Sequence, residues 1–141
     1  MRITLTLLLQ VAGALHLVLM VAGLMMPKAV RLRWHLANLP PFIRQLFWVY
    51  YAFIGFCLVS FSIITIAFAG TLAAGGTLAR ALCTFFALFW TLRLIVAAAV
   101  FDVEPYLTTA FARAGYAALN LVFVYLPVVY VIAASQPGWL K

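Results

Sequence analysis

The chain has few charged residues, and acidic residues are almost missing from it. Among its 141 residues there are two acids and nine lysines or arginines, so charged side chains make up 8% of the sequence. Soluble domains carry about 25% charged residues. The sequence is also 69% hydrophobic, and a chain this short could not keep so much apolar surface away from water. The shortage of charge therefore argues against a soluble domain and predicts that lipid surrounds much of the chain.

Cysteine and the common catalytic motifs are scarce as well. The two cysteines, Cys57 and Cys83, lie in apolar runs without CxxC spacing, which argues against a disulfide framework or a zinc site. The sequence holds no nucleophile elbow, P-loop, Rossmann glycine pattern or HExxH. We therefore predict no catalytic residue, no cofactor and no metal site.

The net charge of +7 has a membrane explanation. In a soluble protein it would indicate nucleic acid. Beside apolar spans, basic residues instead set topology and contact anionic headgroups. We expect membrane lipids as partners, with further membrane-protein subunits or a homo-oligomer as alternatives, and no nucleic acid.

Four apolar runs reach the length of about 20 residues that a bilayer-spanning helix needs. They cover residues 4–26, 45–69, 78–101 and 112–134. The first run exceeds the apolar region of a signal peptide and contains Gln10 and His16, so we expect it to be retained. The runs lack the alternation of polar and apolar residues that a membrane β-barrel would require. The sequence predicts an all-α integral membrane four-helix bundle, with a single transmembrane domain over residues 1–141.

The connections between the runs predict an orientation. The first one, residues 27–44, is the longest and mixes basic with apolar residues, so we expect it to lie along the membrane interface with Trp34 at headgroup depth. A glycine-containing stretch at 70–77 predicts a flexible turn. Loops one and three share a side and hold five basic residues: Lys28, Arg31, Arg33, Arg44 and Arg113. The other side holds three: Arg2, Arg80 and Lys141. The excess predicts both termini outside.

Polar residues inside the spans mark the expected ligand site, since facing lipid would be costly for them. Counting along each span from its cytoplasmic end puts one polar side chain per span at a similar depth: His16, Tyr51, Arg93 and Asn120. Tyr116 shares a helical face with Asn120, and Trp90 lies one turn before Arg93. We predict that these six residues form a ligand-binding site in the cytoplasmic half.

Arg93 has two readings. A guanidinium cannot lose its proton, and no acid lies within its span. In the first reading it faces an anionic ligand while Trp90 stacks on it. In the second it hydrogen-bonds to Asn120, Tyr51 or backbone carbonyls, or extends to the cytoplasmic face. In either case we expect it to point into the bundle, with a polar partner from another span.

Three interpretations of His16 remain open. It is a hydrogen-bonded core histidine, a proton-relay or ligand-contact group, or a haem or metal ligand. Ligation would need a second ligand at the same depth, and the only other histidine, His35, lies in the first loop. Gly13 and Gly23 lie on the same helical face of the first span as His16, and small residues there predict close helix packing.

Two family resemblances bear on function. One compact four-span unit, with a glycine-bearing first span ending in Pro-Lys, resembles the small DoxX-like bacterial membrane proteins. That resemblance implies the bacterial inner (plasma) membrane; the family is functionally diverse, and some of its members are partners of redox or maturation systems. The stretch 33–42 (RWHLANLPPF) is similar to one in the microsomal glutathione transferases, with Asn38 and Pro41 matching. The glutamate of that family's motif is missing: Leu39 follows the asparagine.

These observations favour a non-enzymatic membrane protein that acts as a subunit or a lipid- or quinone-binding partner of a membrane complex. One alternative is a membrane enzyme that acts on an amphipathic substrate, as a glutathione transferase does. Another is a small transporter, although no acid lies within a span to couple protons or cations.

Overall fold

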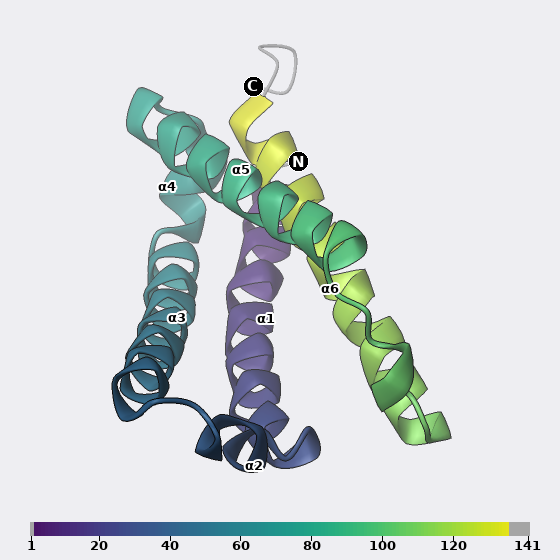
Figure 1. Ribbon diagram of the computed structural model, residues 1–141. Coiled ribbons are helices and arrows are strands. Elements are labelled where there is room, and N and C mark those ends of the chain that lie inside the picture. Colours follow the sequence, from purple (N-terminus) through teal and green to yellow (C-terminus); the bar gives the residue numbers. More distant parts are fainter. Residues whose placement is uncertain (1, 136–141) are drawn as a thin grey trace.

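Four long helices make up most of the chain (Figure 1). The computed structural model describes residues 2–135, and the long helices are α1 (Arg2–Ala29), α3 (Pro41–Ala67), α5 (Thr77–Ala99) and α6 (Ala110–Ser135). All four are long and apolar enough to cross a membrane. The prediction of an all-α membrane helical bundle is confirmed. The fourth helix ends at Ser135, one residue after the predicted end of the fourth span, and the basic residue Lys141 lies outside the described residues.

Shorter elements connect the long helices: α2 (Leu32–Ala37), α4 (Ala69–Ala74) and the 3-10 turn η1 (Glu104–Tyr106). The prediction of a flexible turn over 70–77 is wrong for most of that stretch, because α4 occupies it. Leu72 and Ala73 are buried in the core, so one face of α4 packs against the bundle. The turn itself shrinks to Gly75, whose φ of 77° suits glycine, and Gly76.

The first span does not stop at Pro27, as the sequence predicts, because α1 continues to Ala29. Proline has no N–H, so it leaves the carbonyl four residues earlier without its helical donor. That carbonyl belongs to Gly23, and the hydroxyl of Tyr51 on α3 donates a hydrogen bond to it. A side chain of the neighbouring helix thus replaces the missing backbone bond, and α1 passes through the proline.

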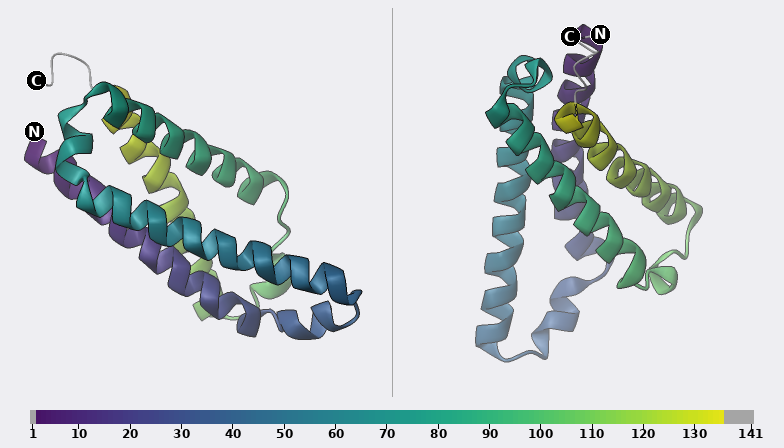
Figure 2. Two further views of the ribbon diagram at one scale, coloured as in Figure 1. Left: turned by 90° about the vertical axis from the view of Figure 1, so that its left-hand side faces the viewer. Right: turned by 90° about the horizontal axis from the view of Figure 1, so that it is seen from above.

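The long helices form two pairs rather than one even bundle. Helix α1 packs along α3 and helix α5 along α6, and the members of each pair run in opposite directions (Figures 1 and 2). The pairs lie closest together where α1 begins and α6 ends, and they separate toward α2 (Figure 1). The bundle is therefore packed tightly at one end only.

The buried residues of the long helices lie toward the end where the two pairs meet. In the spans, every buried residue of the described part lies within residues 9–19, 62–65, 79–90 or 126–133, and these segments together form what we call the closed half. On the α2 side of these segments no residue of the spans is buried, and we call these stretches the open half: residues 20–29, 41–61, 91–99 and 110–125. The open half lies toward α2, the side that the basic residues predict to be cytoplasmic.

Gly13 brings α1 and α3 together in the closed half. A Cβ atom at this position would overlap the side chain of Ile66 and come within 3.3 Å of its backbone nitrogen. The prediction of close packing is confirmed at Gly13 and is wrong at Gly23, where a Cβ would meet nothing within 4 Å. Gly23 contributes its carbonyl to the helix contact instead.

Candidate ligand-binding site

His16 lies at the centre of the closed half, with no exposed surface. The indole Nε1 of Trp90 donates a hydrogen bond to its Nε2 at 3.1 Å, and its Nδ1 lies 2.6 Å from the carbonyl oxygen of Ala12. An indole N–H can only donate, so Nε2 must be the unprotonated nitrogen. Nδ1 then carries the proton and donates to Ala12. The ring is neutral, and both of its nitrogens are used.

Polar groups from the other helices around His16 are also paired. Thr65 and Tyr130 share a hydrogen bond of 2.6 Å between their hydroxyls, and Ser62 donates to the carbonyl of Gly13 at 2.8 Å. The rings of Phe61, Trp90 and Tyr130 meet the imidazole edge-on, at centroid distances of 5.2–6.2 Å. These contacts join all four long helices. They agree with the reading of His16 as a hydrogen-bonded core histidine.

A metal ion would compete with these bonds. Coordination of His16 would require the lone pair that Nε2 gives to Trp90. Within residues 2–135, no three His, Cys, Asp or Glu side chains gather closely enough to hold a metal ion.

Arg93 lies one turn beyond Trp90, at the start of the open half of α5. Its guanidinium carbon lies 5.1 Å from the ring centroid of Phe123 on α6 and 5.4 Å from that of Phe101. Its Nη1 is buried and has no hydrogen-bond partner in the described part of the chain. Arg93 is therefore a cation held between aromatic rings, with the N–H donors of Nη1 left unused.

The predicted hydrogen bond from Arg93 to Asn120 or Tyr51 is not present, and that prediction is wrong. Tyr51 instead donates to Gly23, because Pro27 leaves that carbonyl free. The predicted stacking of Trp90 on the guanidinium is also wrong. Trp90 stacks on Phe123 at 6.0 Å while its N–H is directed at His16, and Phe123 takes the place beneath Arg93.

Asn120 and Tyr116 are half-buried on the open half of α6, and neither makes a hydrogen bond within the described residues. Asn120 precedes Phe123 by three positions and Tyr116 precedes Asn120 by four, so the three share one helical face. That face carries the ring beneath Arg93. The structure thus gathers the predicted residues in three places: His16 with Trp90, Arg93 beside the face of Asn120 and Tyr116, and Tyr51 against α1.

Sequence reasoning missed Thr65 and the carbonyl of Gly23 as polar contacts between helices. Thr65 gave no signal, because threonine is common in apolar spans and its partner Tyr130 lies 65 residues away. Gly23 did give one, since it precedes Pro27 by four positions and its carbonyl had to lack a backbone donor.

Comparison of the chain with protein-family models, with curated proteins and with solved structures gave no match.

Proposed function

We propose that this chain is a non-enzymatic integral membrane protein that binds one amphipathic molecule at Arg93, as the lipid- or quinone-binding partner of a membrane complex. The head of this molecule presents oxygen acceptors, either the phosphate of a lipid or the carbonyls of a quinone. Its tail lies along the open half. The observation that carries the proposal is the buried Nη1 of Arg93, which has no hydrogen-bond partner in the described residues.

The charge of Arg93 needs an acceptor, and residues 2–135 supply none to its Nη1. Inserting an arginine at the centre of a span costs about 2.5–3.5 kcal/mol even on the lowest scales. Residues 1–101 contain no acid at all, and no ion pair forms between Arg93 and Asp102 or Glu104. The rings of Phe101 and Phe123 stabilise the cation, but they offer no oxygen to Nη1. An oxygen from a bound molecule would satisfy that donor.

The open half supplies apolar surface on which a tail could lie. Residues 91–99 of α5 and 110–125 of α6 include no buried residue, although both segments are strongly apolar. Arg93 lies where the open half meets the closed half, three residues after the buried Trp90. Asn120 and Tyr116 would add hydrogen-bonding groups to the head of the ligand, because they share the helical face of Phe123.

The proposal also includes the orientation of the chain and the membrane in which it lies. The five-to-three excess of basic residues supports an orientation with both termini outside and loops one and three in the cytoplasm. The resemblance to DoxX-like proteins supports the bacterial inner membrane. In that orientation the ligand enters from the cytoplasmic leaflet.

Mass spectrometry of the organic extract of the purified protein tests the proposal. The wild type should carry an anionic lipid or a quinone in near-stoichiometric amount, and Arg93→Leu should lose it. Arg93→Lys should retain part, because lysine keeps the charge but lacks the planar fork. Arg113→Leu, which removes an exposed charge at the start of α6, is the control and should carry as much ligand as the wild type.

A folded Arg93→Leu protein that carries the same ligand in the same amount would refute the assignment. Turnover of an amphipathic substrate by the pure chain would replace it with the enzyme alternative, and solute flux in liposomes would replace it with the transporter.

A further inference from the structure

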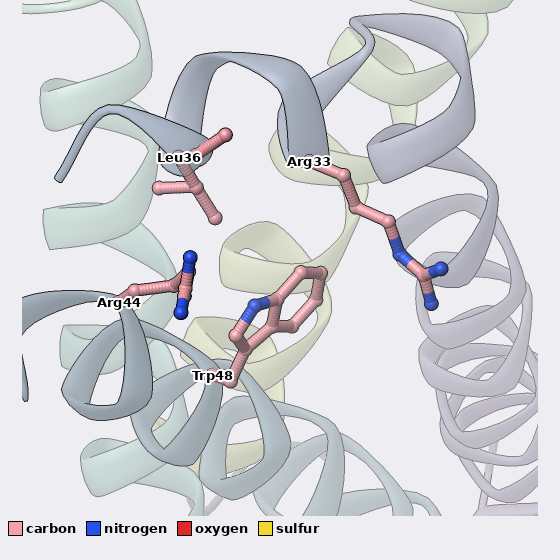
Figure 3. A pocket seen from close by; sticks show the side chains of 5 residues that line it. Arg33, Leu36, Arg44 and Trp48 are labelled. Atoms are coloured by element: carbon pink, nitrogen blue, oxygen red, sulfur yellow. The ribbon is translucent and has the colours of Figure 1, made fainter. Parts of the chain in front are cut away.

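A basic hollow lies at the end of the α1–α3 pair, away from Arg93 and His16. It has a volume of about 360 Å³ and is lined by Arg33, Leu36, Ala37, Arg44 and Trp48. Figure 3 shows Leu36 and Arg44 directed toward the indole of Trp48, with Arg33 extending down its other side. Helix α2 supplies one wall of the hollow and the first turns of α3 supply the other.

Among the residues that the structure describes, no anion balances this hollow. Arg33 and Arg44 are both exposed, and neither forms an ion pair among the described residues. The only acids of the chain, Asp102 and Glu104, lie in the connection between α5 and α6. A second hollow of about 390 Å³ is lined by Arg31, Arg33 and Trp34, so Arg33 stands between two basic surfaces.

Arg44 is placed unfavourably in the absence of an anion. It lies in the first turn of α3, where free backbone N–H groups make the helix end positive, and that turn contains no acid. A cation at this end of a helix is repelled by it. A phosphate in the hollow would be attracted both by the guanidinium and by the helix end.

Trp48, the aromatic side chain of the hollow, is held in place by contacts within the α1–α3 pair. The indole of Trp48 meets the ring of Tyr51 edge-on at 5.7 Å, and Tyr51 is anchored to the carbonyl of Gly23 on α1. Trp48 and Leu36 thus give the hollow an apolar side, while the arginines give it a cationic rim. Tryptophan at such a boundary is typical of the headgroup region of a bilayer.

We infer that this hollow binds the phosphate of an anionic phospholipid from the leaflet that α2 faces. The phosphate lies against the guanidinium of Arg44, with Arg33 as the second cation on the opposite rim of the hollow, and the first part of the acyl chains lies against Trp48 and Leu36. The apolar wall beside the two arginines favours a lipid over free phosphate, which has no apolar part to bury. The site is separate from that of Arg93, so each can be removed without the other.

Native mass spectrometry of the full chain in mild detergent, titrated with phosphatidylglycerol, tests this inference. The wild type should bind phosphatidylglycerol more tightly than phosphatidylcholine, and millimolar inorganic phosphate should not compete. The double variant Arg33→Gln/Arg44→Gln should bind phosphatidylglycerol about tenfold more weakly or worse, given that each basic residue contributes to anionic-lipid binding.

The matched control is Lys28→Gln/Arg113→Gln, which removes two charges from the same side of the protein but outside the hollow. It should bind phosphatidylglycerol within about twofold of the wild type, if its charges act only through the weaker general field. Circular dichroism and gel filtration would verify the fold of both double variants.

Three results would overturn the inference. The first is equal affinity of the wild type for the two lipids, which needs no variant to be informative. The second is an equal loss of affinity in the two double variants. The third is competition by inorganic phosphate at the affinity of the lipid, which would make the hollow a phosphate site.

Discussion

The hydrogen bond between Trp90 and His16 pairs two buried polar groups in an apolar interior. The indole N–H and the imidazole Nε2 would each be costly to bury alone, because both side chains are almost fully buried among apolar residues. Joined at 3.1 Å, they fix both ring orientations and connect α1 to α5. Removing one partner exposes the full desolvation penalty of the other.

Trp90→Phe should therefore destabilise the bundle by about 1–3 kcal/mol through the unpaired Nε2, with a further loss from reduced packing. The double variant His16→Leu/Trp90→Phe should cost less than the sum of the two single changes, because neither polar group is then left alone. Unfolding in mixed detergent micelles, followed by circular dichroism, measures these free energies. Trp34→Phe is the control, since Trp34 is 68% exposed and forms no hydrogen bond through its side chain in the described residues. Strict additivity of the two single changes would contradict the account.

At the scale of single residues, the sequence identified the important polar side chains more reliably than it identified the side chains that they contact. It put His16 and Trp90 in one site, and the two are in contact. It paired Arg93 with Asn120 or Tyr51 from shared depth alone, and that failed. Depth along a helix is readable from the 1.5 Å rise per residue, but the rotation and tilt that decide which faces meet are set by packing. Phe123 rather than Asn120 reaches the guanidinium for that reason.

Among the elements, α1 shows how a helix end can depend on its neighbour. Pro27 removes a donor from α1, and Tyr51 of α3 restores one to the carbonyl of Gly23. Tyr51 in turn supports the ring of Trp48. The last turns of α1, the start of α3 and the basic hollow are thus connected through one hydroxyl.

A double-mutant cycle tests this connection. Tyr51→Phe should cost about 1 kcal/mol in the wild type, because the carbonyl of Gly23 loses its donor. In a Pro27→Ala background the backbone N–H of the new alanine can reach that carbonyl, so Tyr51→Phe should cost clearly less. The free energy of unfolding is measured for all four proteins. The control is Tyr50→Phe, whose side chain is 62% exposed. An equal cost of Tyr51→Phe in both backgrounds would rule out the substitution of one donor for the other.

The contact of α1 with α3 depends on the missing side chain at Gly13. Gly13→Ala should force the helices apart at Ile66 and destabilise the bundle by about 1–3 kcal/mol, the usual range for overpacking. Gly23→Ala, on the same helix, should show no steric penalty, because space is open there. Both are compared by thermal unfolding in detergent. Equal effects of the two changes would contradict the role of Gly13.

For the whole molecule, the sequence predicted the number and order of the spans because length and hydropathy alone determine them. It could not predict that the helices would form two diverging pairs. An evenly packed bundle and this one contain the same apolar runs, and differ in side-chain contacts such as Gly13 against Ile66. The division into a closed and an open half, on which the proposed site depends, therefore needed the structure.

The orientation is a prediction at the same scale. Reporter fusions within residues 70–77 and after Lys141 should both read as external, and a fusion within 27–44 should read as cytoplasmic, because the basic excess lies on that side. A cytoplasmic signal after Lys141, with an external one within 27–44, would reverse the orientation and put the open half toward the outer leaflet.

The most direct test of the central claim, that Arg93 holds an amphipathic molecule in the open half, is native mass spectrometry of the wild type and Arg93→Leu, released from gentle detergent under identical conditions. We expect the wild-type chain to retain the mass of one lipid or quinone that Arg93→Leu lacks, while Arg33→Gln/Arg44→Gln still carries it. Identical bound masses on the wild type and on folded Arg93→Leu would contradict the claim.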